Sequence, residues 1–143
     1  MGALTGIKAG LAALITVVVA ALGGWDAGLE LLLVAMSVDI VTGLASAAVK
    51  RQLSSAASWK GMTRKAFVLL LIGLSVQLDR AIGTAYIHDA VTWFYIVTEL
   101  VSILENCAEV GLPVPKVLIE TLQKLRKQYG DDTPSKPKPE PEG

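Results

Sequence analysis

The chain has 143 residues, 52% of them hydrophobic, and its 13 basic residues balance its 13 acidic residues. The single cysteine, Cys107, excludes an intrachain disulfide and a cysteine-cluster metal site, and the single histidine, His88, leaves no metal-binding or nucleophilic constellation to assemble. There is also no glycine-rich phosphate loop and no basic stripe interleaved with aromatic residues, so we predict no enzyme, no cofactor and no nucleic-acid partner.

The apolar residues stand in long blocks, whereas a soluble helical domain would show polar faces with a 3.6-residue period throughout. Such faces become clear only after Pro113. We therefore predict an all-α integral membrane protein with four transmembrane helices, a C-terminal amphipathic helix and a disordered tail. The predicted spans are residues 9–25, 29–49, 66–86 and 90–106, all within one membrane domain that covers residues 1–129.

The first predicted span, residues 9–25, is an uncharged run close to the ~20 residues that cross a hydrocarbon core. Lys8 precedes it, so the segment also resembles a signal peptide with a cleavage site near Ala20 and Ala21. Because further apolar spans follow, we expect the first helix to be retained.

The second predicted span, residues 29–49, carries Asp39 near its middle. Ala35, Asp39 and Gly43 recur every four residues and share one helix face. A carboxylate among small residues suits a close contact between helices, with the acid facing protein or water. The alternative is that Asp39 caps a neighbouring helix or pairs with a buried lysine or arginine. Under either interpretation Asp39 does not face lipid.

A polar connection is predicted at residues 50–65, within which Ser54, Ser55 and Ser58 are candidates to cap a short helix. Its charged residues are all basic, namely Lys50, Arg51, Lys60, Arg64 and Lys65. Short loops rich in lysine and arginine stay on the cytoplasmic side of a membrane, so we place this segment inside the cell.

The third predicted span, residues 66–86, ends in a charged pair, Asp79 and Arg80. These residues either form an ion pair near the outer interface or point at different partners, since adjacent helical residues diverge by about 100°. The fourth predicted span, residues 90–106, carries a polar stripe, whose members are Glu99, Ser102, Glu105, Asn106 and, just beyond the span, Glu109. This segment spans if another subunit or water covers the stripe; the alternative is an amphipathic helix lying in the interface.

Gly111, Pro113 and Pro115 are predicted to end the fourth helix, because proline is tolerated only in the first turn of a helix. An amphipathic basic helix at residues 115–129 follows and is expected at the cytoplasmic membrane surface. Residues 130–143 are polar and proline-rich and are predicted to be disordered. Four spans then leave both termini in the cytoplasm, which agrees with the positions of the basic segments.

The chain closely resembles the toxin-secretion/phage-lysis holin family over residues 34–118. The resemblance rests on an ordered set of motifs: Asp39-Ile40-Val41-Thr42-Gly43, Lys50, Lys60-Gly61, Lys65, Asp79, Phe94-Tyr95-Ile96, Glu99, Ser102-Ile103-Leu104-Glu105-Asn106 and Gly111-Leu112-Pro113-Val114-Pro115. Single pieces such as Asp-x-x-Thr-Gly have little specificity, whereas the ordered set is specific. The resemblance implies no catalytic residue, and it implies as the family's pattern residues Asp39, Gly43, Lys65, Glu99, Glu105, Asn106 and Pro113.

Membership would imply a small multi-pass protein of the bacterial cytoplasmic membrane that accumulates, oligomerises and opens lesions. Its partners would be the lipid bilayer, further copies of itself and, without required specific contact, an endolysin that leaves through the lesions. The intramembrane oligomerisation candidates are Asp39, Gly43, Asp79, Arg80, Glu99, Ser102, Glu105 and Asn106. We expect single copies to hold Asp39 and the polar stripe against internal partners and oligomers to turn them toward a lumen. The alternatives are a non-lytic secretion pore for a toxin or enzyme and a membrane scaffold without a pore.

Overall fold

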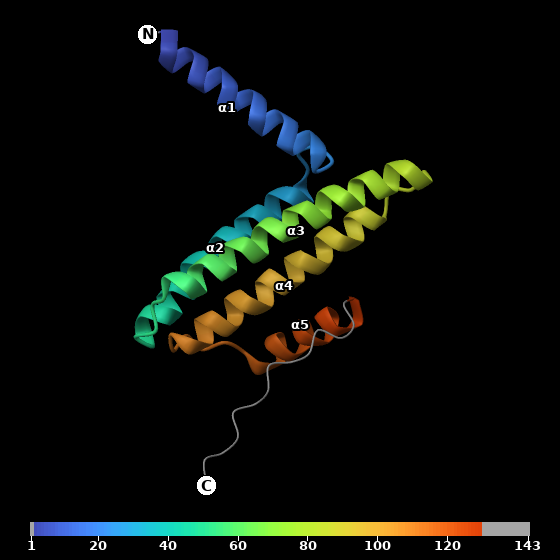
Figure 1. Ribbon diagram of the computed structural model, residues 1–143. Helices are drawn as coiled ribbons and strands as arrows, with labels where there is room; N and C mark the ends of the chain where they lie inside the picture. Colours follow the sequence, from blue (N-terminus) through green and yellow to red (C-terminus); the bar gives the residue numbers. More distant parts are fainter. Residues whose placement is uncertain (1, 130–143) are drawn as a thin grey trace.

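The computed structural model describes residues 2–129, and every regular element in that range is an α-helix (Figure 1). The helices are α1 (Gly2–Ala21), α2 (Ala27–Val49), α3 (Ser55–Ile82), α4 (Ile87–Glu109) and α5 (Lys116–Tyr129). The predicted all-α class is therefore confirmed. The predicted disordered tail, residues 130–143, lies outside the described residues.

Helices α2, α3 and α4 lie side by side and alternate in direction, and α5 folds back against α4 (Figure 1). Helix α4 is central, since it contacts α2, α3 and α5. Leu32 of α2, Ile72 of α3 and Ile96 of α4 are almost completely buried and meet in one apolar core. Each of the three helices thus contributes one apolar face to the bundle and leaves its other faces outside.

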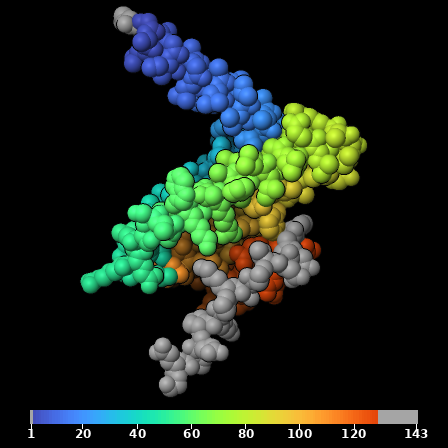
Figure 2. Space-filling view, viewed as in Figure 1, coloured from blue at the N-terminus to red at the C-terminus, as the bar shows by residue number. Residues whose placement is uncertain are grey.

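Helix α1 projects away from the bundle, as the blue helix in Figure 2 shows, and none of its residues is buried. Its exposed side chains are nevertheless large and apolar, for example Leu11 (56% exposed) and Val17 (66%). Only the turn after it docks, because Leu22 is 7% exposed and joins the core. Such a helix has no packing that would hold it folded in water, whereas lipid would cover all its faces.

The outer faces of the bundle are apolar as well. Val34 and Val41 of α2 and Leu70 and Leu74 of α3 are each at least half exposed. By length and composition, α1, α2 and α4 are apolar enough to cross a membrane. Contiguous exposed apolar surface on this scale marks a membrane contact, so the chain is a membrane protein.

The basic connection predicted at residues 50–65 is wrong in extent, because α3 begins at Ser55 and includes Lys60, Arg64 and Lys65. Ser54 has the extended backbone of an N-cap, and its Oγ accepts a hydrogen bond from Ala57 N at 3.5 Å. The chain reverses instead at Arg51, which has a left-handed φ of 54°. A short helix capped by serines of this connection was expected, but not its continuity with the third span, since the polar residues in its first turns interrupt the apolar run.

The first predicted span is also displaced, because α1 begins at Gly2 and ends at Ala21. Gly23 and Gly24 stop the helix with φ values of +100° and +102°, which only glycine adopts without strain. A Cβ on Gly23 would lie 3.2 Å from Val76 Cγ2 and 3.4 Å from His88 Cε1. The turn thus seats the end of α1 directly on α3 and α4.

We expect Gly23→Ala to destabilise the protein by about 1–2 kcal/mol, because a left-handed backbone is costly for a residue with a Cβ and Val76 leaves little room. Thermal unfolding of the purified protein in detergent, followed by circular dichroism, measures the change. Gly6→Ala is the matched control, since Gly6 is helical and a Cβ there meets nothing within 4 Å. Equal melting temperatures for the two variants would contradict the expectation.

Candidate functional site

Three charged side chains from three different helices meet inside the bundle. Lys65 Nζ on α3 lies 2.8 Å from Asp39 Oδ2 on α2 and forms a second ion pair with Glu99 Oε2 on α4. The side chains of Lys65, Asp39 and Glu99 are 14%, 16% and 8% exposed. We call these three residues, together with Asn106, the ion cluster.

Asn106 completes the cluster about two turns after Glu99 along α4. Its Nδ2 donates hydrogen bonds to Asp39 Oδ1 (3.1 Å) and to Thr42 Oγ1 (3.2 Å). Gly43 makes this approach possible, because a Cβ at that position would lie 3.5 Å from Asn106 Nδ2. Asp39, Thr42 and Gly43 therefore act as one surface of α2 that receives the amide of Asn106.

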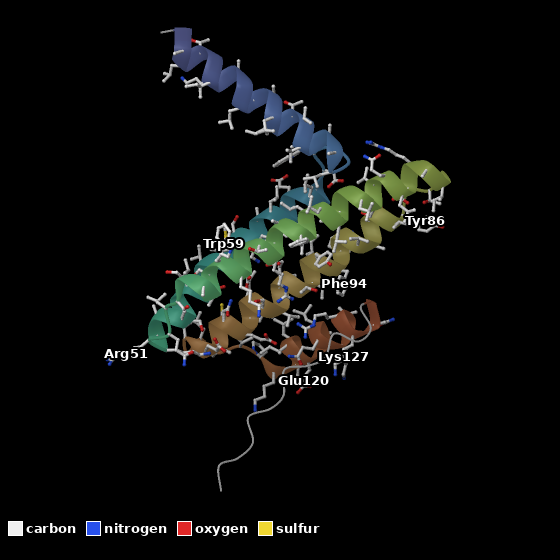
Figure 3. All side chains as sticks on the ribbon, in the orientation of Figure 1. Arg51, Trp59, Tyr86, Phe94, Glu120 and Lys127 are labelled. Carbon is white, nitrogen blue, oxygen red and sulfur yellow. The ribbon has the colours of Figure 1, made fainter. Side chains whose placement is uncertain are left out.

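The ion cluster lies at the same depth in all three helices. Asp39, Glu99 and Lys65 are each about ten residues from the helix end that lies near Lys50, which at 1.5 Å per residue is roughly 15 Å. We call this the basic end of the bundle; Arg51 marks it in Figure 3, and Tyr86 marks the opposite end. A depth of roughly 15 Å is half of the ~30 Å hydrocarbon core of a bilayer.

Two carboxylates share one ammonium in the ion cluster, so its formal charge is −1 when all three groups are ionised. Groups at this depth lose most of their hydration, and their mutual pairing must replace it. Every polar atom of the cluster that is paired binds another helix, which makes the cluster a clasp between α2, α3 and α4.

A second polar contact closes α2 against α4 at the basic end. Lys50 Nζ lies 2.6 Å from Glu109 Oε1, and Ser46 Oγ donates a hydrogen bond to Glu109 Oε2. The side chains of Lys50 and Glu109 are about 40% exposed, so solvent or lipid headgroups screen this pair. The ion pair between Lys50 and Glu109 therefore contributes less to the stability of the bundle than the buried ion cluster does.

The remaining members of the predicted polar stripe do not join the cluster. Glu105 is exposed and accepts a hydrogen bond from Gln123 Nε2 of α5 at 3.1 Å, and Ser102 is half-buried. Helix α5 thus touches the stripe through one hydrogen bond. Gly111 takes a left-handed φ of +88° and, with Pro113 and Pro115, forms the turn from α4 into α5.

Asp79 lies at the end of the bundle opposite the basic end and is 5% exposed. Its Oδ1 accepts hydrogen bonds from Thr84 Oγ1 and from Ile87 N (3.2 Å), and its Oδ2 accepts one from His88 N at 2.8 Å. Asp79 therefore binds the free N–H groups at the start of α4. Arg80 is exposed, so the two neighbours point at different surroundings, which was the second of the two predicted arrangements.

Sequence reasoning missed three side-chain partners of the polar stripe: Thr42 accepts a hydrogen bond from Asn106, and Ser46 and Gln123 donate to Glu109 and Glu105. Thr42 and Ser46 follow Asp39 at helical spacing, which is the signal that was available. No signal marked Gln123. Within residues 2–129, no three histidine, cysteine or acidic side chains form a group that could hold a metal ion.

The bacteriophage holin family matches residues 14–127 of this chain. An uncharacterised 14.9 kDa protein of Clostridium perfringens, from the nagH 3′ region, is 36% identical over 85% of this chain and 94% of its own length. A Clostridium acetobutylicum protein, also uncharacterised, is 35% identical over 74% of this chain and 86% of its own. A probable holin of Bacillus phage phi105 is 30% identical over 73% and 78%. No solved structure gives a significant match. The family match spans the bundle and the ion cluster, and the chain belongs to the bacteriophage holin family.

Proposed function

We propose that this protein is a holin that self-associates in the bacterial cytoplasmic membrane and opens lesions through which a murein-degrading endolysin reaches the cell wall. The observation that carries the proposal is the ion cluster: three charged groups at mid-membrane depth, whose ion pairs within residues 2–129 are with one another. Charged groups paired in this way are costly to expose to lipid, whereas water can hydrate them. They suit a protein that is closed when scattered and lines an aqueous opening when assembled.

The proposal includes four spans, with α3 as the third. Helix α3 packs against α4 and supplies Lys65 to the cluster, so α3 shares the depth of two helices that are apolar enough to span. Its outward residues Phe67, Leu70 and Leu74 are 60–66% exposed. This apolar face supports immersion of the segment after Lys65, in agreement with the span expected at residues 66–86.

We place the basic end in the cytoplasm, following the positive-inside rule. Lys50 and Arg51 then lie inside, Asp26 and Asp89 lie outside, and α5 begins on the cytoplasmic side. Both termini are cytoplasmic in this arrangement. Trp25, between α1 and α2, suits the headgroup region at the outer end, since tryptophan favours both membrane interfaces.

Opening would separate the clasp between α2, α3 and α4 and turn the cluster toward a lumen. The membrane potential biases such a step, because moving one elementary charge across 100 mV is worth about 2.3 kcal/mol. A charge at mid-membrane depth can cross at most about half of that drop, ~1.2 kcal/mol, which corresponds to a shift of roughly sevenfold in a two-state equilibrium. The net charge of the cluster therefore gives the closed state a dependence on membrane potential.

Controlled expression in bacteria that hold a cytoplasmic endolysin tests this proposal. Culture turbidity and membrane potential are followed together. We expect a sudden loss of potential followed at once by lysis, and an earlier onset when an uncoupler is added. Steady growth with the protein confirmed in the membrane would refute the holin proposal and favour a scaffold without a pore.

A non-lytic secretion pore is the second candidate. Proteins of Clostridium and Listeria match alongside that of the phage, so related chains come from bacteria as well as from a phage. The same culture distinguishes the two functions. Release of a cytoplasmic reporter enzyme into the medium at constant turbidity and without an endolysin would favour secretion, whereas turbidity loss that needs the endolysin favours lysis.

A further inference from the structure

The single histidine of the chain lies far from the ion cluster, in a contact at the other end of the bundle. His88 is the second residue of α4, next to the end that Tyr86 marks in Figure 3, and its side chain is 13% exposed. A Cβ on Gly23 would lie 3.4 Å from His88 Cε1 and 3.5 Å from His88 Nε2. The edge of the imidazole ring therefore packs against the turn that follows α1. We call this contact between His88 and the Gly23 turn the seat.

The seat leaves polar atoms of α4 unpaired. His88 Nε2 and Thr92 Oγ1 are buried, and neither has a hydrogen-bond partner among residues 2–129. Thr92 follows His88 by one helical turn, and a Cβ on Gly28 would lie 3.4 Å from Thr92 Cγ2. Both unpaired atoms thus lie on the face of α4 that receives the segment between α1 and α2. Because buried polar groups are nearly always hydrogen-bonded, this face is less stable than an apolar contact of the same size.

The protonation state of His88 decides how costly the seat is. Its Nδ1 lies 3.6 Å from Asp89 Oδ1, whereas its Nε2 faces the Gly23 turn. The neutral ring carries one proton, and the nitrogen that faces the carboxylate is the better place for it. The imidazolium carries a proton on both nitrogens and would bury a charged N–H at Nε2 without an acceptor. Because an unpaired buried charge costs far more than an unpaired lone pair, only the neutral ring suits the seat.

The elements that meet at this end of the bundle carry five charged side chains, namely Asp26, Glu30, Asp79, Arg80 and Asp89. Four of them are acids, so a positive ring is favoured here once water can reach it. Asp79 is buried and accepts a hydrogen bond from the backbone N–H of His88, but no side chain among residues 2–129 bonds Nε2 within the seat. Asp89 is 70% exposed, so it can hold the imidazolium at the aqueous surface. The charged ring is therefore more stable outside the seat than in it.

We propose that His88 controls the attachment of α1 by proton binding: the neutral ring holds the Gly23 turn on α4, and the protonated ring moves out to Asp89 and water and releases that turn. No residue of α1 is buried, and Leu22 of the same turn is what joins the core, so release of the turn frees α1 from the bundle. In the topology on which the proposed function rests, this end faces the outside of the cell. Acidification of the external medium therefore frees α1, which adds control by pH to the proposed opening.

Nitroxide labelling of the full chain in phosphatidylcholine nanodiscs tests the proposal, with the pH changed on both faces together. Trp25→Cys with Cys107→Ser places one label beside the turn, where Trp25 is 61% exposed, and the electron paramagnetic resonance spectrum separates immobile from mobile label. We expect an immobile label at about pH 8 and a growing mobile population toward about pH 5, the range in which histidine changes charge. Release coupled to one proton lowers the ratio of docked to released turn by up to about tenfold per pH unit.

Two variants of His88 remove the titration and keep a side chain in the seat. His88→Phe retains a ring and has no proton to gain, so the turn should stay docked over the whole pH range. His88→Gln is neutral and polar, and it gives the same expectation if the phenylalanine does not fit. A label at Leu53→Cys, in the exposed turn at the basic end, is the matched control and should keep its mobility as the pH falls.

A label beside Gly23 whose mobility does not change with pH would overturn the proposal, and so would an unchanged response in both His88 variants. An equal response at Leu53 would overturn it as well, since acid would then loosen the whole bundle. The spectra do not depend on lysis. A protein that shows the transition but fails to lyse cells would refute only the proposed holin function, whereas lysis by a protein without the transition would refute only the role of His88.

Discussion

Replacing Lys65 with methionine is expected to destabilise the bundle by about 3–5 kcal/mol and to reduce the amount of protein that accumulates in the membrane. The change removes the one cation of the ion cluster and leaves Asp39 and Glu99 facing each other across it. Breaking a buried ion pair by removing one partner is strongly destabilising, because an uncompensated charge remains in a poorly hydrated place. Thermal unfolding in detergent and immunoblotting of membrane fractions measure the two effects.

Two further variants separate loss of the ion pairs from loss of the side chain. Lys60→Met is the matched control, since Lys60 is an exposed lysine of the same helix with no ion pair to the described residues, and it should unfold close to the wild-type temperature. Lys65→Met combined with Asp39→Asn and Glu99→Gln removes every charge of the cluster and should recover most of the lost stability. If Lys65→Met unfolds like Lys60→Met, the ion cluster does not hold the bundle together.

The sequence allowed the ends of α2 and α4 to be predicted within a few residues, and a physical reason supports each. Asp26 Oδ1 accepts a hydrogen bond from Leu29 N at 2.7 Å and so caps the start of α2. Gly111 has a left-handed backbone and so stops the helix just after the end of α4. These signals are local, acting over three or four residues. The cap at Ser54 was a local signal for the start of α3 as well. The charges that follow it interrupt the apolar run, so the span was predicted to begin later.

The partners within the ion cluster lay beyond sequence reasoning for a different reason. Helical spacing showed that Asp39 would face protein or water, and a buried lysine or arginine was one of the alternatives. The choice of Lys65 depends on how α3 lies against α2 and α4, with partners 26 and 34 residues apart in the chain. Periodicity identifies the face of a helix but does not identify which other helix meets that face at which depth.

The lone position of α1 illustrates the same limit. Its uniform apolar character correctly placed a hydrophobic helix near the N-terminus, and such a sequence has no preferred face. Because no side of the helix is polar, the sequence does not show which face, if any, packs against the bundle and which faces lipid. In the structure only the turn after it, at Leu22, joins the core.

Glu99→Gln is expected to delay lysis and to weaken its response to an uncoupler. The amide still accepts a hydrogen bond from Lys65, while Lys65 and Asp39 become a neutral pair, so the cluster loses its net charge of −1. A neutral clasp is less costly to keep inside the bundle, on the order of several kcal/mol per buried ion, which favours the closed state over an assembled opening that must place the cluster in water. It also no longer carries the bias, roughly sevenfold at most, that 100 mV exerts on a charge at mid-membrane depth, so an uncoupler changes the timing of lysis less. Because an uncoupler advances lysis, loss of that bias by itself favours opening, but it is the smaller of the two effects.

Lysis timing in cultures that express equal amounts of each variant, with and without the uncoupler, measures this prediction. Glu105→Gln is the matched control: it removes the same charge from α4, but Glu105 is exposed and bonded only to Gln123 among the described side chains. We expect Glu105→Gln to lyse close to the wild-type time and Glu99→Gln to lyse later. If Glu99→Gln lyses on the wild-type schedule with an unchanged uncoupler response, the net charge of the cluster does not control opening. Separation of the helices would then have to begin elsewhere, with the half-exposed contact between Lys50 and Glu109 as the next place to test.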